Sequence, residues 1–368
     1  MSIQFNISKE PIYDHCFSQD RKTLAITKEN IAEIYDVSLA GKPRLLTTLN
    51  HHDKTITAID ISIHGKIVTC SQDRNALVWE PLSDGSYKPT LVLLRINRAA
   101  TCVRWSPNGL KFAVGSAART IAICYFEEEN DWWISKHIKK PLKSTILSVD
   151  WHENNVLVAC GSTDGHARVF SSYIKSVDSK PAPSIWGERL PFQTLCGDFM
   201  FNGSWVHDVK FSKNGDFIAC VTHDSCLNII TPSGNPATPE IATSNQRVKT
   251  SFLPFKTLLF ADDSKIICAG HDCYSVVFEG NQQGWKQTYA IDDPNTKKQN
   301  ADESQQSALN LFRQLDLKGG NDKSKNSGTL ATIHQNTINV IRSFQEDSQG
   351  VLRFSTCGND GKVVIFDV

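Results

Sequence analysis

The fold is decided by three neighbouring segments, Thr101-Cys-Val-Arg-Trp-Ser-Pro-Asn-Gly109, Lys111-Phe-Ala-Val-Gly-Ser116 and Thr120-Ile-Ala-Ile-Cys-Tyr125. Each contains a short run of β-branched, aromatic and small residues, and polar turns separate the runs, which is the pattern of consecutive β-strands. The runs are apolar rather than alternating, so we expect these strands to be covered on both faces.

The same three-strand module recurs along the chain. Six further copies lie at Ile12–Tyr35 (a degenerate copy), Thr55–Trp79, Ile146–Phe170, Val206–Ile230, Thr257–Phe278 and Thr337–Phe366. The first intervals between third-strand ends are about 45 residues, which is the period of WD repeats. Later intervals are longer, so insertions are expected at about 171–203 and 280–328. Five copies place an aspartate before the third strand, where it suits a tight turn: Asp73, Asp164, Asp224, Asp272 and Asp360.

Seven such copies predict an all-β fold, a seven-bladed WD-repeat β-propeller that forms a single domain over residues 1–368. A single twisted sheet cannot bury both of its faces, whereas radial stacking covers each sheet with its neighbours. The last copy ends at Phe366 without a fourth strand, and residues 2–8 alternate Ile3, Phe5 and Ile7 as a half-buried strand does. We therefore expect this N-terminal strand to complete the last blade and close the ring.

Composition limits the classes of function. Lys and Arg number 39 and Asp and Glu also 39, with a pI near 7.1, and this balance argues against a duplex nucleic-acid binder. No secretory signal and no membrane-spanning run are recognised, so the sequence predicts a cytoplasmic protein. Eleven cysteines with no CxxC argue against disulfides.

The cysteines and histidines do not form the patterns of catalytic or metal sites. Cys70, Cys160, Cys220, Cys268 and Cys357 occupy one repeated position, where we expect them to pack as small apolar side chains. His52 and His334 share the pattern His-x-x-Thr-Ile, and in WD repeats such a histidine joins a buried hydrogen-bond network. With no nucleophile, phosphate or zinc motif, we expect no enzyme, no cofactor and no metal.

Particular stretches go beyond the generic repeat. These are Pro11-Ile-Tyr-Asp-His-Cys16, Val78-Trp-Glu-Pro81, Arg98-Ala-Ala-Thr-Cys-Val-Arg-Trp-Ser-Pro107, Phe126-Glu-Glu-Glu-Asn-Asp-Trp-Trp133 and Ser307-Ala-Leu-Asn-Leu-Phe312. Over essentially its whole length the chain resembles the WD-repeat (40 kDa-type) subunits of the actin-related protein 2/3 complex, the actin-branching nucleator. The resemblance implies a non-catalytic scaffold subunit of the actin cytoskeleton. Its implied partners are actin-related proteins, small helical subunits, nucleation-promoting factors and the mother actin filament.

The insertion before the last blade is the most specific candidate for a contact with a partner protein. Asp302–Leu317 is predicted to be a helix, with a capping-box pair at its start and Gly319-Gly320 at its end. Ala308, Leu311, Phe312 and Leu315 form one apolar stripe beside Leu309. The stripe is interpreted either as docking in a partner's groove or as folding back on the propeller rim.

Two other features leave alternatives open. The basic stretch with Lys136, Lys139, Lys140 and Lys143 suits an acidic protein partner, but it equally suits a solvated strand edge. Arg95, Arg98 and Arg104 are similarly ambiguous. The insertion at 171–203 contains Trp186, which is either part of a contact surface or the anchor of a long outer loop.

Two other classes of function stay open. One is a WD-repeat adaptor that docks short peptide motifs over its channel in another multiprotein assembly. The other is a nucleic-acid-associated propeller, against which the balanced charge weighs.

Overall fold

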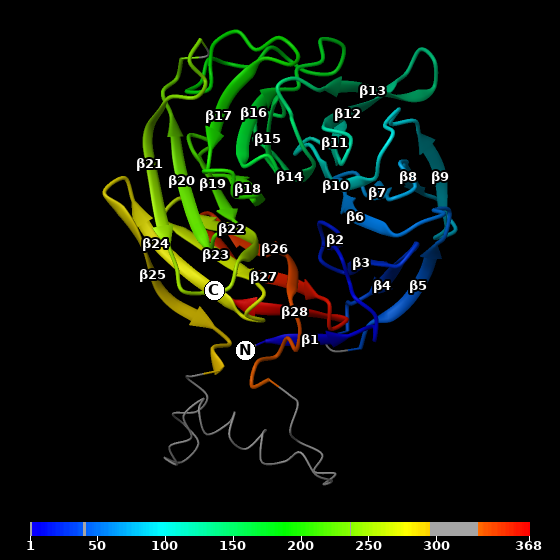
Figure 1. Ribbon diagram of the computed structural model, residues 1–368. Coiled ribbons are helices and arrows are strands. Elements are labelled where there is room, and N and C mark those ends of the chain that lie inside the picture. Colours follow the sequence, from blue (N-terminus) through cyan, green and yellow to red (C-terminus); the bar gives the residue numbers. More distant parts are fainter. Residues whose placement is uncertain (1, 40–41, 236, 295–329) are drawn as a thin grey trace, which may run out of the picture.

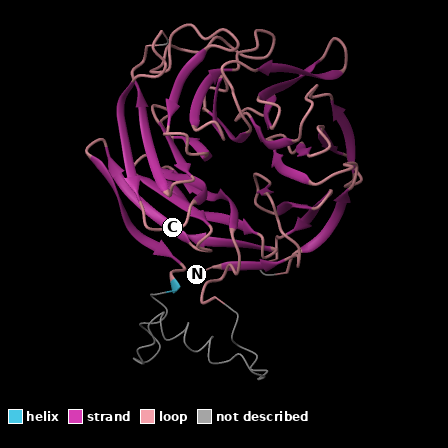
Figure 2. Cartoon of the chain, in the orientation of Figure 1, coloured by secondary structure: helices cyan, strands magenta, loops and turns pink. Residues whose placement is uncertain are grey.

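The computed structural model describes residues 2–39, 42–235, 237–294 and 330–368. Within these residues the chain forms seven four-stranded antiparallel sheets arranged radially around a central channel (Figure 1). Strands and short loops make up nearly all of the ring (Figure 2). The predicted seven-bladed propeller is confirmed. The predicted helix Asp302–Leu317 lies outside the described residues.

The first four sheets follow the order of the chain, from the inner to the outer strand. The first contains β2 (His15–Phe17), β3 (Thr23–Lys28), β4 (Ile31–Asp36) and β5 (Arg44–Leu49). The second contains β6 (Ile56–Ile61), β7 (Ile67–Ser71), β8 (Ala76–Pro81) and β9 (Tyr87–Val92). The third contains β10 (Ala100–Trp105), β11 (Lys111–Ser116), β12 (Thr120–Glu127) and β13 (Trp132–Ile138). The fourth contains β14 (Ile146–Trp151), β15 (Leu157–Ser162), β16 (His166–Ser171) and β17 (Leu195–Met200).

The remaining three sheets complete the ring. The fifth contains β18 (Val206–Phe211), β19 (Ile218–Thr222), β20 (Cys226–Pro232) and β21 (Ala242–Lys249). The sixth contains β22 (Phe255–Asp262), β23 (Lys265–Gly270), β24 (Ser275–Asn281) and β25 (Gly284–Ile291). The seventh contains β26 (Ile338–Asp347), β27 (Gly350–Gly358), β28 (Lys362–Asp367) and, at its outer edge, β1 (Ile3–Asn6).

The outer strands correct the expected bounds of both insertions. Residues 280–291, placed in the second insertion, belong to the end of β24, a turn and β25. Likewise, residues 195–200 of the first insertion form β17. The sequence suggested loops there because outer strands are only half covered. Strand β25, for example, carries mostly exposed polar residues and lacks an apolar run.

Alternating strand directions give the ring two distinct faces. The start face is where every inner strand begins, and it also carries the turns between the second and third strands of each sheet. The end face carries the turns between first and second and between third and fourth strands. The chain segment between β25 and β26, which contains the rest of the second insertion, therefore leaves and rejoins the propeller on the start face.

The core consists of apolar layers between neighbouring sheets. One layer joins the second and third sheets through Val68, Val78, Val103 and Phe112, and equivalent layers lie around the ring. Such burial contributes about 1.5–3 kcal/mol for each large apolar side chain. Because each sheet packs on both faces, its middle strands are buried and mostly apolar.

The two ends of the chain meet in the seventh sheet. Strand β1 pairs antiparallel with β28, and Phe5 lies opposite Val363. Phe5 is buried against Phe17 and Leu24 of the first sheet, so this strand also contributes to the next layer. Ser8 N donates to Gly361 O at 3.0 Å. Gly361 has φ +73°, and a Cβ there would collide with the carbonyl oxygen of Ser8.

Removal of residues 1–8 is expected to lower the melting temperature and broaden the unfolding transition. The deletion exposes the edge of β28 and uncovers the layer around Phe17, and loss of the Phe5 side chain alone costs about 3–5 kcal/mol. Thermal unfolding followed by circular dichroism checks this. The exposed Gln4 offers a control, because Gln4→Ala should unfold as the unaltered chain does. An unchanged melting temperature in the deletion variant would contradict the closure.

Candidate binding site: the start face and the central channel

A β-bulge recurs near the beginning of the inner strands. Pairing with the second strand shifts between Ile56/Ala58, Ala100/Cys102, Ile146/Ser148, Val206/Asp208, Phe255/Thr257 and Ile338/Val340. Each shift leaves one extra residue, and such a residue is turned out of the regular pleat. The extra residues are Thr57, Thr101, Leu147, His207, Lys256 and Asn339. All six, together with Tyr13 before β2, line one cavity of about 230 Å³.

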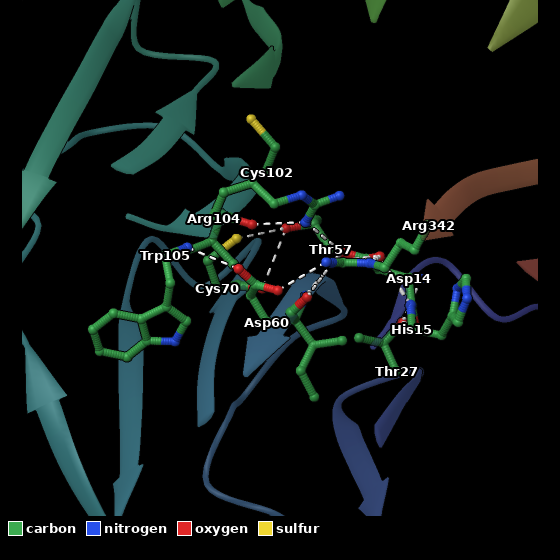
Figure 3. Close-up of polar contacts among 12 residues, drawn as sticks. Asp14, His15, Thr27, Thr57, Asp60, Cys70, Cys102, Arg104, Trp105 and Arg342 are labelled. Atoms are coloured by element: carbon green, nitrogen blue, oxygen red, sulfur yellow. Dashed lines mark hydrogen bonds and ion pairs between the residues drawn. The ribbon is translucent and has the colours of Figure 1, made fainter. Parts of the chain in front are cut away.

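Four charged residues bridge several sheets across the channel. Asp14 precedes β2, Asp60 lies on β6, Arg104 on β10 and Arg342 on β26. Arg104 Nη1 lies 2.8 Å from Asp14 Oδ2, and Arg342 Nη1 lies 2.8 Å from Asp60 Oδ1. Arg342 Nη2 also contacts Asp14 Oδ1 at 3.1 Å (Figure 3). This group is named the channel lattice. It ties the first, second, third and seventh sheets together.

The charges of the channel lattice shift the pKa of Asp14 and of the adjacent His15. Burial alone would raise the pKa of Asp14, but Arg104 and Arg342 lower it to about 2. For the neighbouring His15, burial and the charge of Arg342 lower the pKa to about 3. Asp14 is therefore an anion and His15 neutral at neutral pH. His15 Nε2 lies 2.8 Å from Ser355 Oγ.

The basic stretch singled out in the sequence lies on and beside the third sheet. Lys136 is exposed on β13, with Nζ 5.6 Å from the ring centre of Tyr125 and 5.9 Å from that of Phe192. Lys139, Lys140 and Lys143 are exposed in the following segment of the start face. Lys136 thus makes cation–π contacts of its own. The role of these lysines in binding stays a prediction.

The structure places Arg104 differently from both sequence-based interpretations. The sequence left open whether Arg104 contacts an acidic partner or lies on a solvated strand edge, but its guanidinium group belongs to the channel lattice. Its partner Asp14 lies 90 positions away in the chain, so no local pattern indicated the contact.

A buried histidine network lies in the segment that leads into β26, after the second insertion. His334 Nδ1 lies 3.0 Å from Asp360 Oδ1, and His334 Nε2 lies 2.7 Å from Thr356 Oγ1. His52 makes the matching contacts in the second sheet, with Asp73 and Thr69. The structural role predicted for both histidines is confirmed. Ala308, Leu309, Leu311, Phe312 and Leu315 lie outside the described residues.

The first insertion is fixed to the end face. Trp186 is buried, and its Nε1 donates to Gly215 O at 2.7 Å. Lys111, fully buried on β11, reaches Asp178 Oδ2 of the insertion at 2.5 Å. The interpretation of Trp186 as an exposed contact residue is therefore wrong, because its indole anchors the loop.

The repeated cysteines lie on the second strand of their sheets. Cys70, Cys160, Cys220, Cys268 and Cys357 are all buried, and burial raises the pKa of each thiol. They fill the layers between sheets, as expected of small apolar side chains. Among the described residues, no three His, Cys, Asp or Glu side chains converge as metal ligands would.

Sequence reasoning missed exposed apolar residues on the start face. Trp205 is 50% exposed, and Met200 and Leu253 are exposed in the same region of the fourth to sixth sheets. Beside them, His207 Nε2 lies 2.9 Å from His223 Nδ1.

The sequence analysis also missed the extra residue of each β-bulge, which could have been found by aligning the inner strands of the repeats. A membrane-crossing helix is absent from the described part of the chain.

Comparison with known proteins finds similarity to WD-repeat proteins and to subunit 1 of the actin-related protein 2/3 complex. The WD40 family, described as WD domain, G-beta repeat, matches residues 43–80, 135–171 and 193–230. The chain is 47% identical to actin-related protein 2/3 complex subunit 1 of Saccharomyces cerevisiae, over 99% of this chain and 96% of that protein. It is 44% identical to the subunit 1 of Schizosaccharomyces pombe, over 98% of each chain. Subunit 1A-B of Xenopus laevis is 44% identical over 97% of this chain and 94% of its own length.

Replacement of His15 is expected to weaken the dependence of stability on pH. The unfolded chain protonates His15 near pH 6.5, whereas the folded protein resists this until about pH 3. The unfolded state therefore binds more protons in this window, and stability falls as the pH falls through it. At pH 5 the loss from His15 is about 2 kcal/mol.

Urea unfolding of His15→Gln at pH 7 and pH 5 measures the effect. The variant should lose about 2 kcal/mol less than the unaltered chain between these two values. Ser355→Ala is the matched control, since it removes the hydrogen-bond partner but keeps the imidazole and hence the pH dependence. Equal losses in His15→Gln and the unaltered chain would refute the assignment.

Proposed function

Because the chain belongs to the family of actin-related protein 2/3 complex subunit 1, we propose that it is a non-catalytic scaffold subunit of such a complex. In that role it contributes to assembly, to activator contacts and to mother-filament contacts in branched actin nucleation. It works in the cytoplasm at the actin cytoskeleton. The observation that carries the proposal is 47% identity to a subunit of that name over 99% of the chain.

Exposed apolar side chains on the ring support the proposal that partner proteins cover parts of this subunit. Large apolar side chains are exposed on both faces, including Trp205 and Leu253 on the start face and Leu39 and Leu110 on the end face. Exposed apolar groups of this kind often mark contacts with other proteins. A closed ring of paired strands presents such contacts at fixed separations, which suits a scaffold.

We also propose that the second insertion and the basic stretch are two of the contact elements. Phe312 and Leu315 are two of the large members of the apolar stripe predicted from the sequence, and docking would bury them. Lys139, Lys140 and Lys143 are exposed, and their charge suits an acidic surface such as that of actin or of an activator. Both elements belong to chain segments that join the propeller on its start face.

Affinity capture of the tagged chain from its own cells is expected to recover a stoichiometric assembly. Mass spectrometry should identify two actin-related proteins and several small helical subunits at one copy each. A tagged chain lacking residues 1–8 serves as the control, because a ring that does not close should recover little. Isolation of the intact, folded chain as a free monomer would overturn the proposal.

The double variant Phe312→Asp, Leu315→Asp is expected to reduce branching while leaving the propeller folded. Each charge prevents burial worth about 1.5–3 kcal/mol, so branches per filament length should fall at least about tenfold. Fluorescence microscopy of the reconstituted complex measures branches, and circular dichroism checks the fold. Asn310→Asp adds a charge off the apolar stripe and should branch normally. Normal branching by the double variant would exclude the docking role.

A further inference from the structure

The end face of the ring carries a cavity of about 670 Å³. It lies between the fifth and sixth sheets, whose outer strands β21 and β25 are at the left of Figure 1. Its walls come mainly from the β18–β19, β22–β23 and β24–β25 turns and from parts of β20 and β21. Because all three turns belong to the end face, this end-face cavity lies on the opposite side of the ring from the two contact elements proposed above.

Hydrogen bonds between the two sheets hold the walls of the end-face cavity. Asn214 N donates to Asp263 Oδ1 at 3.0 Å, which joins the β18–β19 turn to the β22–β23 turn. Gln246 Nε2 donates to Gln282 O at 2.8 Å, which joins β21 to the β24–β25 turn. The cavity is therefore formed by this chain alone, as binding sites in proteins commonly are before a ligand arrives.

The floor of the end-face cavity is apolar. Ile229 of β20 is buried there, and Phe217 and Trp285 are half-buried beside it. Phe217 packs edge to face against Phe260, with 5.6 Å between the ring centres, and this contact orients its ring. Such a floor suits a large apolar side chain. The indole of Trp285 also suits a cation, because a cation over an aromatic ring face is attracted by it.

The rim of the end-face cavity is acidic. Asp216, Asp262 and Asp263 line it, and no Lys, Arg or His is among its described lining residues. Asp216 is exposed, and among the described residues its carboxylate has no hydrogen-bond or ion-pair partner. Asp262 and Asp263 each use Oδ1 to accept from a backbone N–H, whereas Oδ2 of each accepts no described hydrogen bond. Each of the three carboxylates thus keeps at least one oxygen for a ligand.

The lysines next to these turns in the sequence do not neutralise the rim. Lys213 Nζ lies 3.1 Å from Glu346 Oε1, and Lys265 Nζ lies 3.4 Å from Glu279 Oε1. Lys286, which follows Trp285, does not line the cavity. The cavity therefore combines an apolar floor with an excess of negative charge.

We propose that the end-face cavity binds a basic segment of a partner protein, with a Lys or Arg side chain directed to Asp216 and Asp263. A neighbouring large apolar side chain of the segment packs on the floor. Charge complementarity selects a basic partner and disfavours an acidic one. The volume falls in the range of roughly 300–1,000 Å³ that is usual for binding pockets, which suits a few side chains of a short segment. This contact goes beyond the proposed function, because the lysines of the start face suit partners of the opposite charge.

Selection of random peptides displayed on phage, with the full chain as bait, tests the chemistry of the ligand. The selected peptides should share a Lys or Arg beside a large apolar residue. Binding of a synthetic copy, measured by fluorescence anisotropy, should weaken as the salt concentration rises, since exposed charges are screened. Selected peptides without a basic residue would overturn the proposal.

The double variant Asp216→Asn, Asp263→Asn tests where the selected peptide binds. It should weaken binding at least about tenfold, because both carboxylates lose their charge. Asparagine keeps an oxygen that can accept from Asn214 N, so the walls should persist, and circular dichroism checks the fold. If the double variant does not fold, Asp216→Asn alone provides the comparison, with severalfold weaker binding expected.

Asp84→Asn is the matched control. Asp84 Oδ1 accepts from Ser86 N at 2.9 Å in the β8–β9 turn of the end face, as Asp262 Oδ1 does from Ser264 N, but Asp84 lies outside the cavity. This variant should bind the peptide as the unaltered chain does.

Three further results would each overturn the proposal. One is unweakened binding by the folded double variant, or by folded Asp216→Asn where that variant is the comparison. Another is an equal loss of binding in Asp84→Asn. The third is self-association of the chain, measured by sedimentation, that the double variant abolishes, because that result would assign the cavity to a second copy.

Discussion

The propeller depends on hydrogen bonds from the side chains of each inner strand to unpaired backbone groups of the next inner strand. An inner strand pairs with its own sheet on one side only, so backbone groups along its other edge need partners. Side chains of the preceding inner strand supply them. Carboxylates do so between several sheets: Asp14 accepts from Ile59 N at 3.1 Å, Asp60 from Trp105 N at 2.8 Å, Asp150 from Phe211 N at 2.9 Å and Asp208 from Leu258 N at 3.0 Å. Hydroxyl and amide groups complete the circle: Thr101 donates to Ile146 O at 2.6 Å, Thr257 accepts from Ile341 N at 3.2 Å and Asn339 donates to Ile12 O at 2.8 Å.

This circle of hydrogen bonds explains why a charged lattice lies inside an otherwise apolar ring. A carboxylate held beside a backbone N–H in a narrow channel is poorly hydrated, and it is stabilised when a cation joins it. Arg104 and Arg342 are those cations, and their forked guanidinium groups reach carboxylates of two other sheets. Buried ion pairs often add little net stability, but removal of one partner is costly. The lattice therefore links β10 to the first sheet and β26 to the first and second sheets by ion pairs between residues far apart in the chain.

The sequence revealed whatever depends on local repetition. The third strands recur in every copy, the cysteine position recurs in five copies, and the pattern of His52 and His334 recurs in two. The outer strands were harder to recognise, because β25 and its equivalents face solvent and lack an apolar run. The channel could not be predicted, since Arg342 and Asp14 are separated by 328 positions and meet only when the ring closes. The helix predicted at Asp302–Leu317 lies outside the described residues.

The extra residue of each β-bulge differs in type from sheet to sheet, so the fold does not require one particular residue type at this position. Thr57, Thr101 and Asn339 donate hydrogen bonds to main-chain carbonyls of the next sheet, so their polarity has a structural reason. No such bond is made by Tyr13, Leu147, His207 or Lys256, although they occupy the same place in the ring. The propeller would close with apolar residues there, as Leu147 demonstrates. Lys256 is half-buried, and its Nζ donates to the side-chain Asn339 Oδ1 of the next sheet at 2.6 Å. Lys256 thus links the sixth and seventh sheets through side chains, where Thr57, Thr101 and Asn339 link their sheets through a main-chain carbonyl.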